Sequence, residues 1–107
     1  MKLWIDDVRM EPSGYERCRT VWTAMTKCEE AYNEEKHLLE IDEINIDHDA
    51  GDLSAFGGDY IKLLEWLEFK EFSDGWQIPT KFHVHSMNPV GKLNMERIIR
   101  KNGWSLF

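Results

Sequence analysis

The stretch Ile44-Asn45-Ile46-Asp47-His48-Asp49 joins a short apolar run to three ionisable side chains. The two isoleucines predict a short buried strand, and the chain then passes directly into an acid, a histidine and a second acid. Active sites of open α/β sheets lie at the carboxyl ends of the strands. We therefore expect Asp47, His48 and Asp49 to stand at the rim of a sheet, where a site can be built.

Two other stretches share this pattern of an apolar run that ends in polar side chains. Lys2-Leu3-Trp4-Ile5 is followed by Asp6-Asp7, and Phe82-His83-Val84 is followed by His85-Ser86. Because parallel strands end at the same edge of a sheet, we expect the three strand ends to converge on one site.

The remaining chain alternates short strands with amphipathic helices. In order we expect a strand over 1–5, a short strand over 15–19, a helix that begins at Thr20 or Thr23 and runs to about Tyr32, the strand 44–46, a helix opened by Gly57-Gly58-Asp59, the strand 81–85, and a helix from Asn88-Pro89 to Asn102-Gly103. Pro12 and Gly14 mark the segment after the first strand as a loop. The alternation predicts a parallel sheet covered on both faces, which is a small three-layer α/β fold.

Composition limits the classes of function that fit. The 107 residues suit one domain spanning 1–107, and the net charge of −7 argues against broad binding to a nucleic-acid backbone. No apolar run approaches the roughly 20 residues that cross a bilayer. Cys18 and Cys28 lack metal-ligand spacing and predict reduced thiols in a cytoplasmic protein. Aromatic residues that we expect to be exposed, such as Trp22 or Trp76, leave a protein partner open.

The acids at the strand ends predict a metal site. Asp6, Asp7 and Asp47 would repel one another at one sheet edge, and a hard divalent cation, Mg²⁺ or Mn²⁺, relieves that repulsion. Adjacent residues in an extended segment point to opposite sides, so one of the pair faces Asp47, or both do through a bend in the loop. Solvated loop acids are the alternative reading.

Histidines near these acids are candidates for proton transfer. Either His85 or His48 could act as a general acid or base near neutral pH. We count Asp47, His48, Asp49 and His85 as the candidate catalytic residues.

Residues that suit an anion gather after the strand 81–85. The fresh N-terminus of a helix attracts phosphate through its free N–H groups and its dipole. The candidate substrate-binding residues are Arg9, Ser86, Asn88, Lys92 and Asn94.

With these motifs laid out, the sequence resembles the cyclic-phosphate-processing receiver-like domain family, a divergent relative of the response-regulator receiver. The matching residues are Leu3-Trp4-Ile5-Asp6-Asp7-Val8-Arg9 with Pro12 and Gly14, Arg19-Thr20, Ile46-Asp47-His48-Asp49, Gly58-Asp59-Tyr60, Trp66-Leu67-Glu68 and the run His85-Ser86-Met87-Asn88-Pro89-Val90-Gly91-Lys92-Leu93-Asn94-Met95.

The resemblance implies a flavodoxin-like or receiver-like sheet of strand order 2-1-3-4, with a possible fifth element. It implies that Asp6-Asp7 match the metal-binding acid pair, Asp47 the phosphoacceptor and Ser86 the hydroxyl after the fourth strand. The additional His and Asn residues of the family suggest that it handles cyclic phosphates. A receiver places a Lys after a fifth strand, and no clear equivalent is found in this sequence.

Three functions remain open on the sequence. The leading hypothesis is a metal-dependent phosphoesterase that acts on a cyclic phosphate of a nucleotide or an RNA end. The second is a phosphoacceptor receiver domain that uses Asp47, and the third is a non-catalytic module that binds a nucleotide or a protein.

Overall fold

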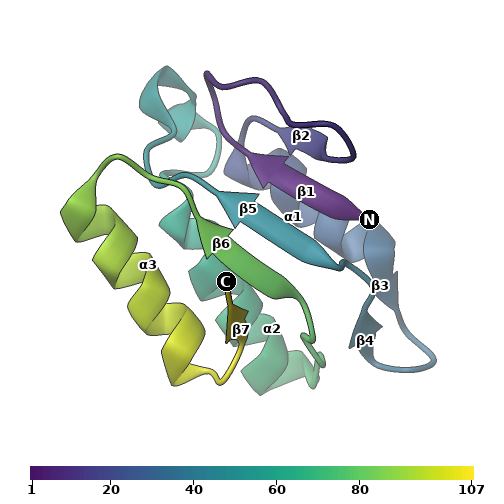
Figure 1. Ribbon diagram of the computed structural model, residues 1–107. Helices are drawn as coiled ribbons and strands as arrows, with labels where there is room; N and C mark the ends of the chain where they lie inside the picture. Colours follow the sequence, from purple (N-terminus) through teal and green to yellow (C-terminus); the bar gives the residue numbers. More distant parts are fainter.

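A five-stranded parallel sheet with three helices packed on it forms the fold, and the computed structural model describes all 107 residues (Figure 1). The strands of the sheet are β1 (Lys2–Ile5), β2 (Glu16–Cys18), β5 (Glu43–Ile46), β6 (Lys81–Val84) and β7 (Ser105–Leu106). Their order is β2-β1-β5-β6-β7. This confirms the receiver-like order 2-1-3-4, and β7 supplies the fifth element.

The helices follow the strands as the sequence predicts. They are α1 (Val21–Ala31), α2 (Ile61–Asp74) and α3 (Pro89–Lys101), and a 3-10 helix, η1 (Gly51–Ala55), precedes α2. Thr20 caps α1 by accepting a hydrogen bond from the Thr23 backbone N–H, and Asn88 caps α3 with Pro89 in the first turn. No helix combines the length and the apolar character that a membrane span requires.

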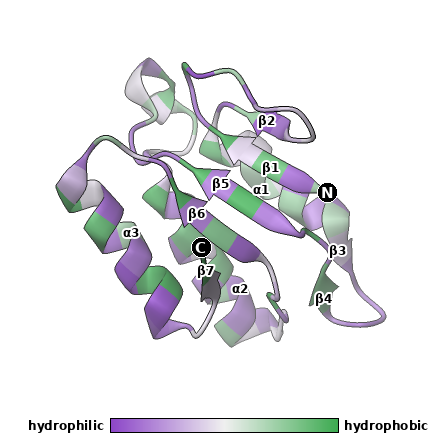
Figure 2. Cartoon of the chain, in the orientation of Figure 1, coloured by the Kyte–Doolittle hydropathy of each residue, from purple (hydrophilic) through white to green (hydrophobic).

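Strand register divides the side chains between the two faces of the sheet. Leu3, Ile44 and Phe82 are level with one another, and so are Ile5, Ile46 and Val84. These six side chains are buried, and they join residues of all three helices in one core cluster. Figure 2 shows the alternation as hydrophobic and hydrophilic bands along β1, β5 and β6.

The structure has two layers where three were expected, because all three helices pack on the same face. In Figure 1 no helix crosses in front of β1, β5 and β6. The other face, called the open face below, carries Trp4, Asn45 and His83 from the three central strands. Residues 6–15, which connect β1 to β2, contain Pro12 and Gly14 and form no helix that would cover this face.

Two small elements were not expected. Tyr32, predicted to lie in the first helix, instead ends it in extended conformation, so α1 stops at Ala31. An antiparallel pair follows, formed by β3 (Tyr32–Asn33) and β4 (Leu38–Leu39).

Candidate functional site

Three strand ends converge at one edge of the sheet. Ligand atoms of Asp6, Asp47 and His85 all lie within 4.8 Å of one another, and we call these residues the acid group. The backbone N–H of Asp47 donates to Ile5 O at 2.9 Å, and that of His85 donates to Ile46 O at 3.0 Å. The ladder between the parallel strands therefore continues far enough to bring the side chains together.

Asp6 is the buried member of the acid group, with 1% of its surface exposed. Its Oδ1 accepts hydrogen bonds from the backbone N–H groups of Val8 and Arg9, both at 2.9 Å. Burial by itself raises the pKa of Asp6, but the two backbone N–H groups and the contact with His85 outweigh burial and lower the pKa overall. Asp6 is thus a carboxylate whose second oxygen is aimed at the site.

His85 is held on every side. Its Nε2 lies 2.9 Å from Asp6 Oδ2, and its Nδ1 lies 2.6 Å from Asn45 Oδ1. The indole of Trp4 stacks on the imidazole with ring centroids 4.0 Å apart and planes within 3°. Burial lowers the pKa of His85, and the hydrogen bond to Asp6 and the charges of Asp6 and Asp47 oppose that effect without cancelling it.

Asp7 points away from the acid group, as expected for the neighbour of Asp6 in an extended segment. Its Oδ2 lies against Gly51, only 2.7 Å from where a Cβ of that residue would stand. The backbone carbonyl of Asp7 accepts hydrogen bonds from Arg17 at 3.0 Å and Arg19 at 3.2 Å. Of the predicted metal ligands, the structure brings Asp6 and Asp47 together with His85 and leaves Asp7 facing η1.

Tyr60 lies beneath these carboxylates and reports their combined charge. Its hydroxyl donates to Arg19 O at 2.6 Å, and its ring is fully buried. Burial raises the pKa of Tyr60, and the negative charges of Asp7, Asp6 and Asp47 raise the pKa further. Tyr60 therefore stays a neutral phenol within reach of the negative charges of three carboxylates.

His48 belongs to a second cluster rather than to the acid group. His48, Asp49 and Asp59 offer ligand atoms within 4.8 Å of one another, and His48 Nδ1 lies 2.8 Å from Asp49 Oδ1. Asp59 Oδ1 also accepts from the backbone N–H of Ala50 at 3.0 Å. The imidazole of His48 packs on Gly91 in the first turn of α3, where a Cβ would stand 2.5 Å from His48 Cγ.

The predicted anion-binding residues surround the start of α3. Asn88 Oδ1 accepts from the Gly91 backbone N–H at 3.0 Å, and Ser86 Oγ accepts from the Asn88 backbone N–H at 3.1 Å. Lys92 is half-buried and Asn94 is exposed, both on α3. Arg9 reaches across from the β1–β2 loop and donates to His85 O at 3.2 Å. The side-chain oxygens of Ser86 and Asn88 are therefore engaged in the turn, while the amide N–H₂ of Asn88 has no partner within the protein.

The family model for the cyclic-phosphate processing receiver domain matches residues 1–101. The chain belongs to this family. No curated protein and no solved structure matches the chain.

The donor set of this receiver domain fits a divalent metal ion. The acid group offers two carboxylates and one imidazole nitrogen, from three neighbouring strands. Carboxylate oxygens suit Mg²⁺ and Mn²⁺, whereas an imidazole ligand suits transition metals. A set that contains both could hold a divalent metal ion.

Some residues that shape the receiver-domain site were not predicted from the sequence. Asn45 lies between two buried isoleucines and looks like an ordinary polar residue on the solvent-facing side of a strand. Trp4 looks like an ordinary core residue. Asp59 was expected only to open a helix and to belong to the matching stretch Gly58-Asp59-Tyr60, and α2 begins two residues later, at Ile61. A polar residue that alternates with apolar ones just before an acidic strand end was the one signal that could have found Asn45.

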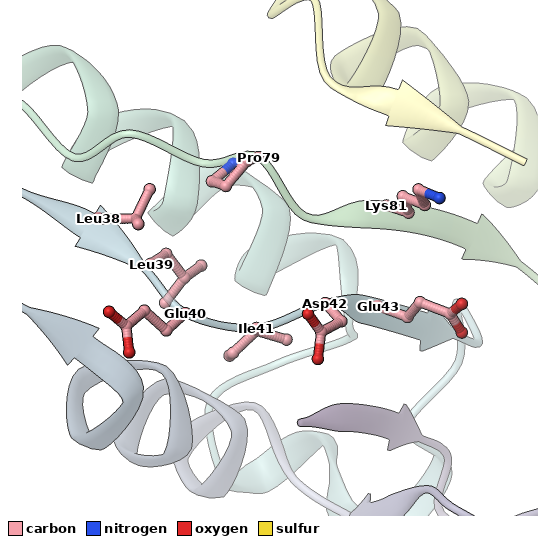
Figure 3. Close-up of a pocket in the computed structure, with 8 residues that line it drawn as sticks. All are labelled: Leu38, Leu39, Glu40, Ile41, Asp42, Glu43, Pro79 and Lys81. Carbon is pink, nitrogen blue, oxygen red and sulfur yellow. The ribbon is translucent and has the colours of Figure 1, made fainter.

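A hollow of about 450 Å³ lies at the opposite end of the sheet. Figure 3 shows its lining: residues 38–43 follow one another along one segment, and Pro79 and Lys81 lie on the neighbouring segment. The lining residues are Leu38, Leu39, Glu40, Ile41, Asp42, Glu43, Pro79 and Lys81. None of the predicted site residues of the receiver domain takes part in this hollow.

Proposed function

We propose that this receiver domain binds a divalent metal ion and hydrolyses a cyclic phosphate, of the 2′,3′ type that nucleotides and RNA ends carry. The observation that carries the proposal is the convergence of Asp6, Asp47 and His85 within 4.8 Å at the edge of the sheet where α3 begins. The membership of the chain in a family described by cyclic-phosphate processing supports the choice of substrate.

The acid group is the proposed metal site. Asp6, Asp47 and His85 would hold the ion, and Asp7 would add negative charge beside it. A bound divalent ion supplies Lewis-acid polarisation of a phosphoryl oxygen and a more acidic water. Because Oδ1 of Asp6 is taken by two backbone N–H groups, its Oδ2 is the oxygen available to a metal.

The start of α3 is the proposed phosphate site. The N-terminus of a helix presents free N–H groups and a positive dipole end to an anion. Arg9 from the β1–β2 loop and Lys92 from α3 add positive charge, while Ser86 and the free amide of Asn88 add donors. Asn94, which is exposed further along α3, would contact the ribose.

The proposed reaction is hydrolysis of one phosphoester bond of the cyclic phosphate. Water adds to the phosphorus atom, one of the two ester bonds to ribose breaks, and the departing ribose oxygen takes up a proton, which leaves a phosphomonoester. His48 is the proposed proton donor, because Asp49 binds its Nδ1 and no protein group binds its Nε2. An acid of this kind contributes about 10²–10⁴-fold to the rate.

The test is direct turnover. Purified protein is incubated with a panel of 2′,3′-cyclic nucleotides and an RNA that ends in a cyclic phosphate, with Mn²⁺ or Mg²⁺, and the product is followed by ³¹P NMR. We expect turnover that is faster with Mn²⁺, that is lost in Asp47→Asn and that falls about 10²-fold or more in His48→Asn. His37→Asn, on the exposed β3–β4 turn at φ 52°, is the matched control.

Three outcomes of this assay would contradict the proposal. Folded protein that turns over no member of the panel would exclude hydrolysis of these substrates. Tight metal-independent binding of an intact nucleotide would favour a binding module. Stable beryllofluoride modification of Asp47, lost in Asp47→Asn, would favour a phosphoacceptor domain. Phe107, not a lysine, follows the fifth strand, β7, which weighs against that last reading.

A further inference from the structure

The part of the open face that solvent reaches most freely lies over β6 and β7. Residues 6–15 fold over β1, where Tyr15 meets the edge of the Trp4 ring with centroids 6.0 Å apart, and Trp4 is only 9% exposed. Beyond β5 the face carries His83 and Phe107, and Phe107 is 52% exposed. No helix lies in front of β6 in Figure 1. We call this part of the open face the β6 strip.

Two aromatic rings stand together on the β6 strip. The ring of Phe107, which follows β7, packs on the imidazole of His83 with centroids 5.3 Å apart and planes at 34°. Nδ1 of His83 donates to the backbone oxygen of Phe107, so the imidazole is held in place. Nucleobases of every kind stack on such side chains, because every base has a π-face. The pair therefore offers a platform on which one base can lie.

The strand residues of the open face carry more positive than negative charge. Lys2, Arg17 and Lys81 share this face by register. Glu43, the one acid among these strand residues, accepts from the Tyr15 hydroxyl at 2.6 Å and lies 3.9 Å from Lys2 Nζ. Lys81 is exposed and makes no ion pair. The face is thus locally suited to a phosphodiester backbone, in a chain whose net charge is −7.

Arg9 connects this face to the proposed phosphate site at the start of α3. Its guanidinium donates to His85 O at 3.2 Å, and its backbone carbonyl accepts from the Trp4 indole at 3.1 Å. Because Trp4 faces the open side and His85 leads into α3, the exposed Arg9 lies at the rim between the two. From that rim β6 runs away from the site, with His83 two residues and Lys81 four residues before His85. Neighbouring residues on one face of a strand are about 6.6 Å apart, a step that an extended nucleotide can span.

We infer that the substrate is a single-stranded RNA whose last nucleotide carries the cyclic phosphate, and that this RNA leaves the site past Arg9 and lies along the β6 strip. The base before the last nucleotide would stack on Phe107 and His83, and Lys81 would bind a phosphodiester. A 2′,3′-cyclic phosphate requires the 2′-hydroxyl of ribose, so the strand is RNA and not DNA. This inference rests on the proposed function, because it extends the same site.

A protein partner suits the β6 strip less well than RNA does. The core of a protein interface is apolar and depleted of charged residues. Among the residues of β6 and β7 and the one that follows, Phe107 is the single exposed large hydrophobic residue, and Lys81 is exposed beside it. One exposed ring among polar side chains favours a nucleic-acid strand, whose bases stack on isolated rings and whose phosphates bind isolated cations.

Binding of a labelled RNA in the absence of metal tests the inference without turnover. The probe is a five-nucleotide RNA with fluorescein at its 5′ end and a 2′,3′-cyclic phosphate at its 3′ end, and its binding is measured by anisotropy in chelator. Cytidine 2′,3′-cyclic phosphate, measured by competition, is the ligand without a preceding strand. We expect the wild type to bind the RNA at least about 10-fold more tightly than this mononucleotide.

Variants on the β6 strip should weaken RNA binding and leave the affinity for the mononucleotide unchanged. Phe107→Leu removes the ring, so the Kd for the RNA should rise about 10-fold. Lys81→Gln removes one phosphate contact, so the dependence of log K on log salt should become shallower by about 0.7. Phe72→Leu and Lys36→Gln, both exposed and both outside the five-stranded sheet, are the matched controls and should change neither quantity.

RNA that binds no more tightly than the mononucleotide would overturn the inference. So would an unchanged Kd and salt dependence in Phe107→Leu and Lys81→Gln, or equal losses in the two controls, with all folds verified by circular dichroism. A wild type that binds no RNA but self-associates, with Phe107→Leu monomeric in sedimentation, would make the strip a protein interface instead. RNA binding as expected but no turnover with metal contradicts only the proposed hydrolysis. Turnover of cyclic mononucleotides with no preference for RNA contradicts only this inference.

Discussion

At the scale of single residues, the contact between Gly91 and His48 predicts that a glycine-to-alanine substitution in a helix lowers the free energy of unfolding, where such a substitution usually raises it. Replacing a helical glycine with alanine ordinarily stabilises a protein by about 0.4–1 kcal/mol. Gly91 lies in the first turn of α3, and a Cβ there would stand 2.5 Å from His48 Cγ and 2.6 Å from His48 Cδ2. We expect Gly91→Ala to destabilise the fold by about 1–3 kcal/mol, because the imidazole must move out of a packed position.

Urea unfolding of a double-mutant cycle measures this contact. In a His48→Ala background the space beside Gly91 is free, so Gly91→Ala should become neutral or stabilising there. Equal destabilisation by Gly91→Ala in both backgrounds would show that the contact with His48 does not set the cost.

The acids and histidine of the site could be predicted from the sequence because each follows a strand. The sequence could not predict which of Asp6 and Asp7 faces the site, because the side chains of adjacent residues point to opposite sides. The loop decides it by placing the N–H groups of Val8 and Arg9 over Asp6 Oδ1. Asn45 stayed hidden because its importance comes from its contact with His85, which follows a different strand.

At the scale of elements, the cap of α3 combines a structural role with the proposed binding role. Asn88 Oδ1 caps the helix through the Gly91 N–H, and its amide N–H₂ is free. Asn88→Ala should lower the free energy of unfolding by about 1 kcal/mol, the usual cost of losing a cap. Asn88→Ser keeps a capping oxygen and removes the amide, so it should remain as stable as the wild type and raise KM.

Thermal unfolding and steady-state kinetics of the two variants separate these roles. If Asn88→Ala unfolds at the wild-type temperature, the cap contributes nothing. If Asn88→Ser leaves KM unchanged, the amide does not contact substrate.

The strand order was predictable, and the single covered face follows from it. Crossovers between parallel strands are right-handed, so connections that run in the same direction across the sheet place their helices on the same face. β2 to β5, β5 to β6 and β6 to β7 all run in one direction, and only β1 to β2 runs in the other. Since residues 6–15 form a loop, no helix reaches the open face. The two-residue strands β3, β4 and β7 are too short to leave a periodic pattern.

At the scale of the whole molecule, the net charge is −7, and several of the negative charges lie together at one edge of the sheet. Asp6, Asp7 and Asp47 all act on Tyr60, and Arg17 is the cation that offsets them there. Arg17 also donates to the backbone carbonyls of Asp6 and Asp7 at 3.3 Å and 3.0 Å. Arg17 of β2 therefore holds the acidic loop against the sheet, so the charges of the site also affect the stability of the fold.

Acid stability of the metal-free protein tests this link. The pKa of Asp6 is lowered below its ordinary value of 3.8 in the folded protein, so its ionised form stabilises the fold above that value. The contribution is lost as the pH falls through the lower, folded-state pKa.

Asp6→Asn cannot titrate, so the stability difference between wild type and Asp6→Asn should be largest near neutral pH and should shrink as the pH falls below about 4. Urea midpoints from pH 7 downward in chelator measure it, with the exposed Asp52→Asn as control. Parallel pH profiles of wild type and Asp6→Asn would mean that the hydrogen bonds from Val8, Arg9 and His85 do not favour the ionised carboxylate.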